Sequence, residues 1–164
     1  MEKRTISFSP PDITELEIAE VAEALRSGWI TTGPRTKMLE CRLAAYMETG
    51  KTDIDCTSKE AIAKYSQKVV CLNSATAAEE LNLHILGVGP GDEVITTPLT
   101  FAASANCVLY CGGKPVFADV DEKTYNIDPE EIKKKITDKT KAILPVHLAG
   151  QPCDMEAIHA IARE

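Results

Sequence analysis

The chain has 164 residues, of which 44% are hydrophobic and 26% charged, and its formal net charge at pH 7 is -7. This length allows one core and argues against two independent domains, and the composition is typical of a globular protein rather than a disordered or fibrous one. The densest basic run, residues 133–135, lies beside Glu130 and Glu131, so the clustered cations that bind nucleic acid are missing.

Neither a membrane nor a metal is indicated. No apolar run reaches the length of about 18 residues that could span a bilayer, and residues 1–4 precede no apolar signal core, which predicts a cytoplasmic protein. The six cysteines form no C-x-x-C pair, and a reducing compartment would keep them as thiols. Cys107 and Cys111 have helical i, i+4 spacing, but no His or second Cys pair completes a metal site, which favours buried free thiols.

The amino-terminal part is predicted to be helical. Asp12 with Glu15 has the pattern of a capping box, and the helix it begins ends at Gly28. A turn-rich link over residues 29–34 leads to a second helix from about Thr36 to Met47, with Met38, Leu39, Leu43, Ala44 and Met47 on its apolar side. Residues 50–57 are polar and turn-like, and residues 59–66 could form one or two helical turns.

From residue 68 onward, short apolar runs alternate with helical patterns. Strands are predicted over 68–72, 93–97, 115–120 and 141–146, and helices over 73–86, 101–110, 128–136 and from the cap at Asp154 to the last residue. This alternation predicts an α/β fold with a mainly parallel sheet and helices on both faces. Because a parallel unit normally returns to its sheet, a last helix without a following strand suggests a piece of a longer chain.

Small polar residues follow the first of these predicted strands. In the segment LNSATAA, residues 72–78, the free N–H groups of a helix start and the hydroxyls of Ser74 and Thr76 could together bind a phosphate. The alternative is that Asn73 or Ser74 only caps the helix. The local pattern leaves both interpretations open.

Two further segments lie just beyond predicted strand ends, where ligands of open α/β sheets gather. Phe101 could stack on a flat cofactor ring there, or belong to the core. In PVHLAGQP, residues 145–152, His147 and Gln151 are predicted to point toward the same edge, and His147 could contact a ligand or satisfy nearby backbone groups. His84 and His159 fall within predicted helices and are interpreted as structural or exposed.

Common catalytic motifs are absent from the sequence. There is no G-x-S-x-G, no G-x-x-x-x-G-K-[ST], no H-E-x-x-H and no G-x-G-x-x-G. This excludes the usual hydrolase, NTPase, zinc-protease and simple dinucleotide-binding signatures, so any chemistry would depend on a cofactor or on a segment outside this chain.

Six blocks, in order, resemble the amino-terminal half of the DegT/DnrJ/StrS family of sugar aminotransferases. They are GWITTGP (28–34), NSATAA (73–78), GVGPGDEVI (87–95), TFA (100–102), PVFADV (115–120) and PVHLAGQP (145–152). The resemblance implies the amino-terminal part of the fold-type-I large domain, pyridoxal phosphate (PLP) as cofactor, and a homodimer with its active sites at the subunit interface. It further implies transfer of an amino group from glutamate to a nucleotide-linked keto-sugar for cell-surface polysaccharides, most similar to the enzymes that aminate a UDP-linked 4-keto-pentose.

Individual residues match the family pattern. Ser74, Ala75 and Thr76 match its phosphate-binding turn, and Phe101 matches the aromatic residue that stacks on the pyridine ring. Thr31 and Thr32 match a loop that touches substrate or the neighbouring subunit. The resemblance therefore implies cofactor contacts at four positions and a substrate or interface loop at two.

The resemblance also divides the chain into three parts. Residues 1–50 correspond to the amino-terminal helices and active-site loop, 51–66 to an insertion, and 67–164 to a partial cofactor-binding domain. In the family, the Asp that pairs with the pyridine nitrogen and the Lys that forms the Schiff base follow the point where this sequence stops, so we expect the chain alone to be inactive. A sugar dehydratase of the same family, in which His replaces that Lys, and a non-catalytic binding module are the alternatives.

Overall fold

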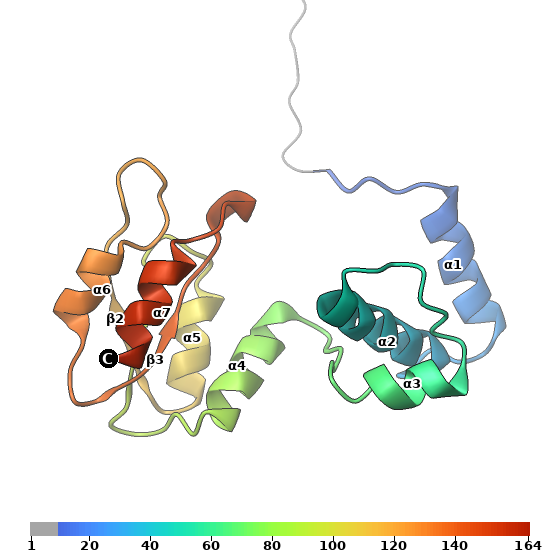
Figure 1. Cartoon of the computed structure of the whole chain (residues 1–164), viewed down its shortest axis with the longest axis horizontal. Helices are drawn as coiled ribbons and strands as arrows, with labels where there is room; N and C mark the ends of the chain where they lie inside the picture. The colour runs from blue at the N-terminus through green and yellow to red at the C-terminus, as the bar shows by residue number, and fades with distance from the viewer. Residues whose placement is uncertain (1–9) are drawn as a thin grey trace, which may run out of the picture. The chain divides into compact units, whose positions relative to one another are not determined.

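The computed structural model describes residues 10–164 (Figure 1). Residues 1–9, where a signal segment is not expected, lie outside the described residues. The chain divides into two compact units, Met1–Cys71 and Leu72–Glu164. The three-part division expected from the sequence stays a prediction.

Residues 10–71 of the first unit contain three helices, and the first of these has a different cap from the one predicted. Helix α1 spans Glu15–Arg26, and its N-cap is Thr14, whose hydroxyl accepts a hydrogen bond from the Leu16 N–H at 3.2 Å. Glu17 in turn accepts from the Thr14 N–H at 2.6 Å. Thr14 and Glu17 thus form the capping box, and the prediction of Asp12 with Glu15 was wrong because the chain offers two overlapping matches to one spacing.

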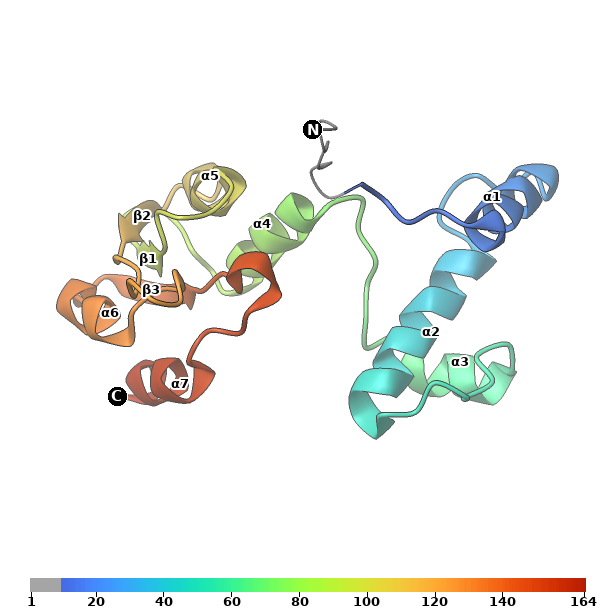
Figure 2. The same cartoon turned by 90° about the horizontal axis from the view of Figure 1, so that it is seen from above.

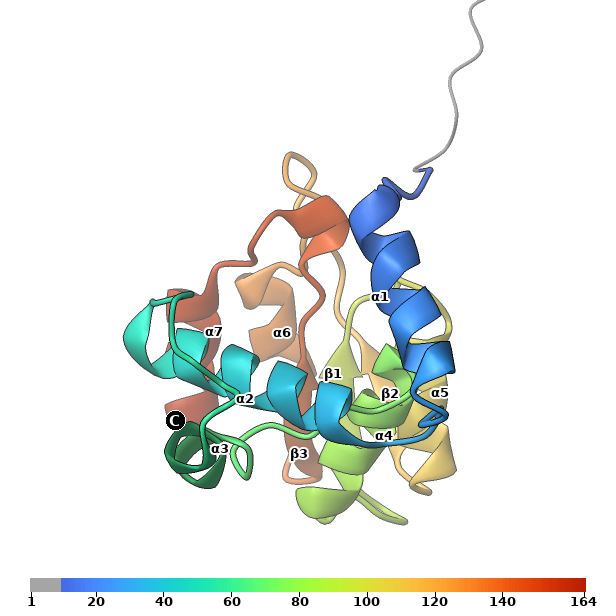
Figure 3. The ribbon, with the colours of Figure 1, turned by 90° about the vertical axis from the view of Figure 1, so that its right-hand side faces the viewer.

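Helices α2, Pro34–Thr49, and α3, Lys59–Tyr65, share the core of this unit (Figure 3). Met38 packs against that core, whereas Leu39, Leu43 and Met47 are exposed, so the apolar face predicted for the second helix was only partly right. Helix α1 buries no residue. This core consists of the buried residues Cys41, Ala44, Ala45, Cys56 and Tyr65.

The second unit is an α/β structure with a parallel sheet. Strands β1, Glu93–Thr96, β2, Lys114–Phe117, and β3, Thr140–Leu144, lie in the order β2-β1-β3, and β1 pairs in parallel with both neighbours. The helices are α4, Ala75–Ile85, α5, Ala103–Tyr110, α6, Pro129–Lys135, and α7, Met155–Arg163, with a 3-10 turn, η1, at Leu148–Gly150.

Helices cover both faces of this sheet, as Figure 2 shows. Successive side chains of β1 point to opposite faces. Val94 packs with Leu83 of α4 and Val108 of α5, and Ile95 packs with Ile132 of α6 and with α7. The predicted fold class, a mainly parallel sheet between two helical layers, is confirmed.

The strand predicted over residues 68–72 is absent, and that prediction was wrong. This segment is irregular and makes no ladder with any strand among residues 10–164. Val70 is 70% exposed and Leu72 42% exposed. An apolar run becomes a strand only where a neighbouring strand accepts its N–H groups, and the local sequence does not reveal that neighbour.

The other strands form close to their predicted positions and end earlier. Strand β2 stops at Phe117, and Val120 makes only an isolated antiparallel bridge to Ile127. Strand β3 stops at Leu144. The predicted helices after β1 and β2 are present, with α5 beginning two residues later than expected. No helix of the described part of the chain is long and apolar enough to cross a bilayer.

Candidate functional site

The start of α4 has the geometry expected of an anion site. Ser74 is the N-cap, and its hydroxyl accepts a hydrogen bond from the Ala77 N–H at 3.1 Å. The preceding N–H groups, those of Ala75 and Thr76, have no acceptor within residues 10–164. Ser74 and Ala75 are exposed and Thr76 is half-buried. The Ser74 hydroxyl therefore caps the helix, while two backbone donors at the positive end of the helix stay available to a phosphate.

Phe101 lies in the turn before α5 rather than in the helix. The Ser104 N–H donates to the Phe101 carbonyl at 3.1 Å, and the Thr100 and Ser104 hydroxyls lie 3.2 Å apart. The Phe101 side chain is 81% exposed. An exposed ring held on a hydrogen-bonded turn does not serve the core, so its face is free to stack on a planar ligand.

Helices α4 and α5 pack against each other on one face of the sheet. The Cys107 Sγ lies 3.7 Å from Glu79 Oε2, and the Cys111 Sγ donates to the Glu80 carbonyl at 3.8 Å. The pKa of the Cys107 thiol is raised to about 11, mainly because the thiol is buried and secondly because the Glu79 carboxylate is near. The helix that Ser74 caps and the helix that follows Phe101 are thus neighbours, and both Cys107 and Cys111 are buried thiols.

Burial raises the pKa of the Cys111 thiol, as it does for Cys107. Among residues 10–164 there is no group of three or more His, Cys, Asp or Glu residues that could hold a metal ion.

The carboxyl ends of β1 and β3 meet at one edge of the sheet. The hydroxyl of the fully buried Thr96, the last residue of β1, donates to the carbonyl of Leu144, the last residue of β3, at 2.9 Å. At this edge, the segment that carries Phe101 follows β1, and the segment that carries His147 follows β3. Figure 1 shows the loop before α6 and the η1 turn projecting beyond this same edge.

His147 makes a backbone contact, one of the two roles the sequence left open. Its Nδ1 accepts a hydrogen bond from the Cys153 N–H at 3.1 Å, and the side chain is exposed. Gln151 is also exposed, and its carbonyl accepts from the amide of Asn126 at 3.1 Å. The loop after β3 is therefore stabilised by a hydrogen bond within the loop, between His147 and Cys153, and by one from Asn126, which lies earlier in the sequence.

Asn126 is the residue that sequence reasoning missed. It is 4% exposed, and all the hydrogen bonds that its side chain makes within residues 10–164 go to the loop after β3. It donates to the carbonyls of Gln151 and Pro152 at 3.1 Å each, and it accepts from the Leu148 N–H at 3.1 Å. In the sequence, Asn126 is marked only as a polar residue between Tyr125 and Ile127, shortly before α6.

Thr31 and Thr32 lie in the first unit, on the exposed link between α1 and α2. The Trp29 indole N–H donates to the Thr32 carbonyl at 3.0 Å, which folds the link back on itself. Thr31 lines a small pocket with Trp29 and Arg35. Because this link belongs to the other unit, its predicted role at the substrate or the subunit interface stays a prediction.

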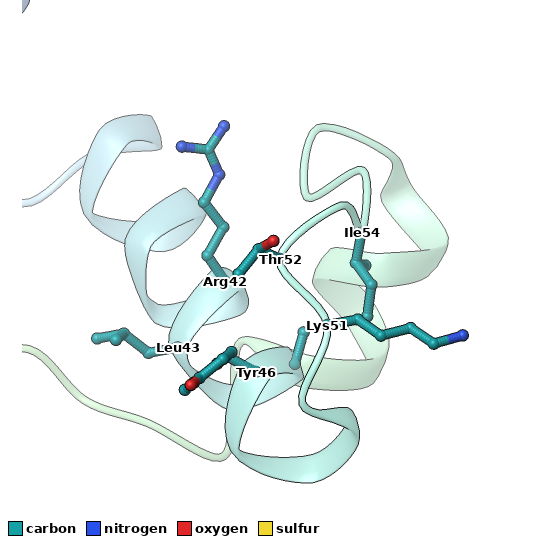
Figure 4. A pocket seen from close by; sticks show the side chains of 7 residues that line it. Arg42, Leu43, Tyr46, Lys51, Thr52 and Ile54 are labelled. Carbon is teal, nitrogen blue, oxygen red and sulfur yellow. The ribbon is translucent and has the colours of Figure 1, made fainter.

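A second pocket of the first unit has a different character. It has a volume of about 300 Å³ and lies between α2 and residues 51–54 (Figure 4). Its walls are mainly apolar, from Leu43, Tyr46 and Ile54, and in Figure 4 the Arg42 and Lys51 side chains extend away from one another. No set of polar groups converges there, so the pocket does not have the features of a cofactor site.

Proteins of known structure share the fold over most of this chain. Two structures of Spr1654 from Streptococcus pneumoniae, its PMP-form and its PLP-form, each have a TM-score of 0.80 and 47% identity, covering 96% of this chain and 36% of that one. An aminotransferase from Psychrobacter cryohalolentis has a TM-score of 0.79 and 40% identity, with the same coverage. NtdA from Bacillus subtilis with bound cofactor PMP has a TM-score of 0.75 and 34% identity, over 99% of this chain and 35% of that one.

Sequence comparison points to the same class. The spore coat polysaccharide biosynthesis protein SpsC from Bacillus subtilis (strain 168) is 45% identical over 158 residues, which are 96% of this chain and 36% of SpsC. This chain thus spans about a third of the length of the relatives it matches.

The parallel sheet between two helical layers, with its helix starts at the carboxyl edge, is the amino-terminal portion of the large domain of a fold-type-I aminotransferase. The profile of the DegT/DnrJ/EryC1/StrS aminotransferase family matches residues 11–164. The chain belongs to that family.

Proposed function

We propose that this chain is the amino-terminal third of a PLP-dependent aminotransferase that moves an amino group from glutamate to a nucleotide-linked keto-sugar. The observation that carries the proposal is a pair of N–H groups, those of Ala75 and Thr76, that have no acceptor among the described residues and lie on a helix packed beside the one that follows the exposed Phe101 ring. Family membership over residues 11–164 supports it.

The residues of this chain fit the cofactor in two places. The N–H groups of Ala75 and Thr76, with the positive end of α4 behind them, would hold the phosphate, and the Thr76 hydroxyl could add a third donor. The face of Phe101 would lie against the pyridine ring and orient it. The cofactor, when bound, supplies an electron sink for transfer of the amino group.

The proposed activity also needs residues that this chain does not contain. We propose that the Schiff-base Lys and the Asp that pairs with the pyridine nitrogen lie in a following segment, so residues 1–164 alone do not transaminate. Thr31 and Thr32 would contact substrate or a second subunit of a homodimer. A UDP-linked 4-keto-pentose is the predicted acceptor, and SpsC supports a role in polysaccharide biosynthesis.

The test uses the full-length protein that contains this chain, called the parent below. Purified with PLP, it should show the absorption band of a protein-bound cofactor. Glutamate should bleach the band as the cofactor takes up the amino group, and a nucleotide keto-sugar should restore it. A parent with no such band, or one that glutamate leaves unchanged, contradicts the proposal.

Phe101 provides a specific variant for this test. Phe101→Ala should raise the Kd for PLP about fivefold, because loss of a stacking contact costs roughly 1 kcal/mol. Since the ring is exposed, the thermal stability of the apoprotein should hardly change. Tyr110→Ala is the matched control, because Tyr110 is an aromatic residue, 63% exposed, at the other end of α5. An equal loss of affinity in both variants would remove Phe101 from the site.

A further inference from the structure

The loop from His147 to Cys153 is fixed by hydrogen bonds that leave one polar group of His147 outside the network. The Cys153 N–H donates to His147 Nδ1 at 3.1 Å, and the Cys153 thiol donates to the Val146 carbonyl at 3.2 Å. The Gly150 N–H donates to the His147 carbonyl at 3.1 Å. Within residues 10–164, no partner is present for His147 Nε2.

This arrangement determines which nitrogen of the neutral ring carries the proton. Nδ1 accepts a backbone N–H, so it cannot carry a proton itself, and the neutral imidazole must be protonated at Nε2. The exposed end of the ring is therefore a hydrogen-bond donor. A donor in a fixed orientation recognises an oxygen acceptor.

The backbone in and near this loop is strained, and the buried side-chain amide of Asn126 stabilises the strained conformation. The only non-glycine residues with positive φ in the described part of the chain are Tyr125, at 59°, and Ala149, at 52°. Asn126 directly follows Tyr125. Its side chain bonds to the Leu148 N–H and the Gln151 carbonyl, which lie on either side of Ala149 in the sequence. Such strain costs about 1–3 kcal/mol per residue and persists where surrounding contacts over-determine it, often beside a ligand.

The position of the loop suggests the ligand. It follows β3 at the carboxyl edge of the sheet, and the Thr96 to Leu144 hydrogen bond joins this strand end to the one that leads to Phe101. The loop with the His147 donor and the turn with the exposed ring therefore leave neighbouring strand ends. Ligands of open parallel sheets bind at this edge.

We propose that His147 is a ligand-binding residue whose Nε2–H donates a hydrogen bond to a phosphoryl or hydroxyl oxygen of the cofactor or of the nucleotide sugar, and that Asn126 positions it. This role rests on the proposed function. Asn126 acts through the loop and touches no ligand.

Two substitutions of His147 separate its two nitrogen atoms. His147→Asn places an amide oxygen near the position of Nδ1, so it can still accept from the Cys153 N–H but offers no outward donor. His147→Gln places an amide NH₂ near the position of Nε2, so it keeps an outward donor and loses the acceptor. In the parent, we expect His147→Asn to weaken ligand binding about tenfold, the loss of one hydrogen bond, and His147→Gln to weaken it less.

The two ligand sources give different kinetic results. A higher Kd for PLP in His147→Asn assigns the oxygen to the cofactor, and a higher KM for the nucleotide sugar with an unchanged Kd for PLP assigns it to the substrate. If both constants stay at the wild-type value in His147→Asn, or if only His147→Gln is impaired, the ring serves the loop alone and the proposal fails.

A measurement without turnover checks the ring itself. In the parent labelled with ¹⁵N at histidine, the resonances missing from the His147→Asn spectrum belong to His147. At a pH where the ring is neutral, they should report the tautomer protonated at Nε2, and the tautomer protonated at Nδ1 overturns the proposal. A wild-type parent that binds no PLP overturns the proposed function and this role together, whereas normal PLP binding with a silent His147→Asn variant overturns this role alone.

The positioning role of Asn126 is tested by a double-mutant cycle. Asn126→Asp keeps the acceptor for the Leu148 N–H and loses the donors to the Gln151 and Pro152 carbonyls. It should weaken the same ligand constant as His147→Asn, and it should have no further effect in the His147→Asn background. Additive effects of the two substitutions would show that Asn126 acts on the whole fold and would exclude a positioning role.

Discussion

Glu93 shows how one buried charge is accommodated at the start of the sheet. Its side chain is 10% exposed, and its two oxygens accept from the Lys114 ammonium at 2.9 Å and from the Thr137 hydroxyl at 2.7 Å. These hydrogen bonds, that of Lys114 first, lower the pKa of the carboxyl group below its ordinary value of 4.5. The charged form is therefore more stable in the folded chain than in the unfolded one.

The lowered pKa predicts a pH dependence of stability. A carboxyl group with a depressed pKa stabilises the fold above its ordinary value, and this contribution is lost as the pH falls from 4.5 through the lower, folded value. Glu93→Gln should reduce the free energy of unfolding at neutral pH and flatten its decline below this range, measured by urea denaturation across the acid range. Glu130→Gln, which breaks an exposed ion pair to Lys133, should change neither. An unchanged acid slope in Glu93→Gln would contradict the assignment.

At the residue scale, the sequence predicts groups that act locally and misses those that act at a distance. The cap at Ser74 follows from four consecutive residues, and its hydroxyl does accept the Ala77 N–H. Asn126 bonds to residues 22 to 26 positions further along the chain, so no local pattern could mark it. Whether Phe101 contacts a cofactor stays a prediction, because the exposure of a ring does not name its partner.

The link between α1 and α2 depends on a close contact at Gly33. A Cβ atom built on Gly33 would lie 2.1 Å from the Trp29 indole nitrogen, so no side chain fits without displacing the indole. The φ of Gly33 is -159°, which any residue can adopt, so the contact alone requires glycine. The same indole donates to the Thr32 carbonyl.

Gly33→Ala should therefore move the indole and break that hydrogen bond. Trp29 is the only tryptophan of the chain, so its fluorescence reports the change directly. We expect a red-shifted emission and a loss of about 1 kcal/mol of stability, the value of one hydrogen bond. Gly89→Ala is the control, because nothing lies within 4 Å of a Cβ built there. Wild-type emission from Gly33→Ala would mean that the indole does not occupy this position.

At the element scale, periodicity predicts helices better than it predicts strands. The helices from α4 to α7 lie close to their expected positions because N-caps such as Ser74 and Asp154 can be recognised from the residues next to them in the sequence. A strand also needs a neighbour. Strand β1 has one on each side, whereas residues 68–72, equally apolar, have none in the described chain. Sequence could not distinguish the two, because the hydrogen-bonding partner is a property of the fold.

At the scale of the whole molecule, each unit has its own core, and the two cores differ in size. The first unit buries Cys41, Ala44, Ala45, Cys56 and Tyr65, most of which are small. The second unit buries larger side chains on both faces of its sheet, among them Leu83, Ile95 and Ile132. Since hydrophobic stabilisation grows with the apolar area removed from water, the first unit should be the less stable.

The 164-residue chain should then unfold in two steps as urea increases, and hydrogen exchange measured by mass spectrometry can follow each unit separately. Amides of α2 and α3 should lose protection at a lower urea concentration than those of β1, because their core is smaller. Tyr65→Ala should move only the first step, and Ile95→Ala, which removes a fully buried side chain, should move only the second by about 2–5 kcal/mol. A single transition shared by all amides, shifted alike by both substitutions, would show that the two units fold as one.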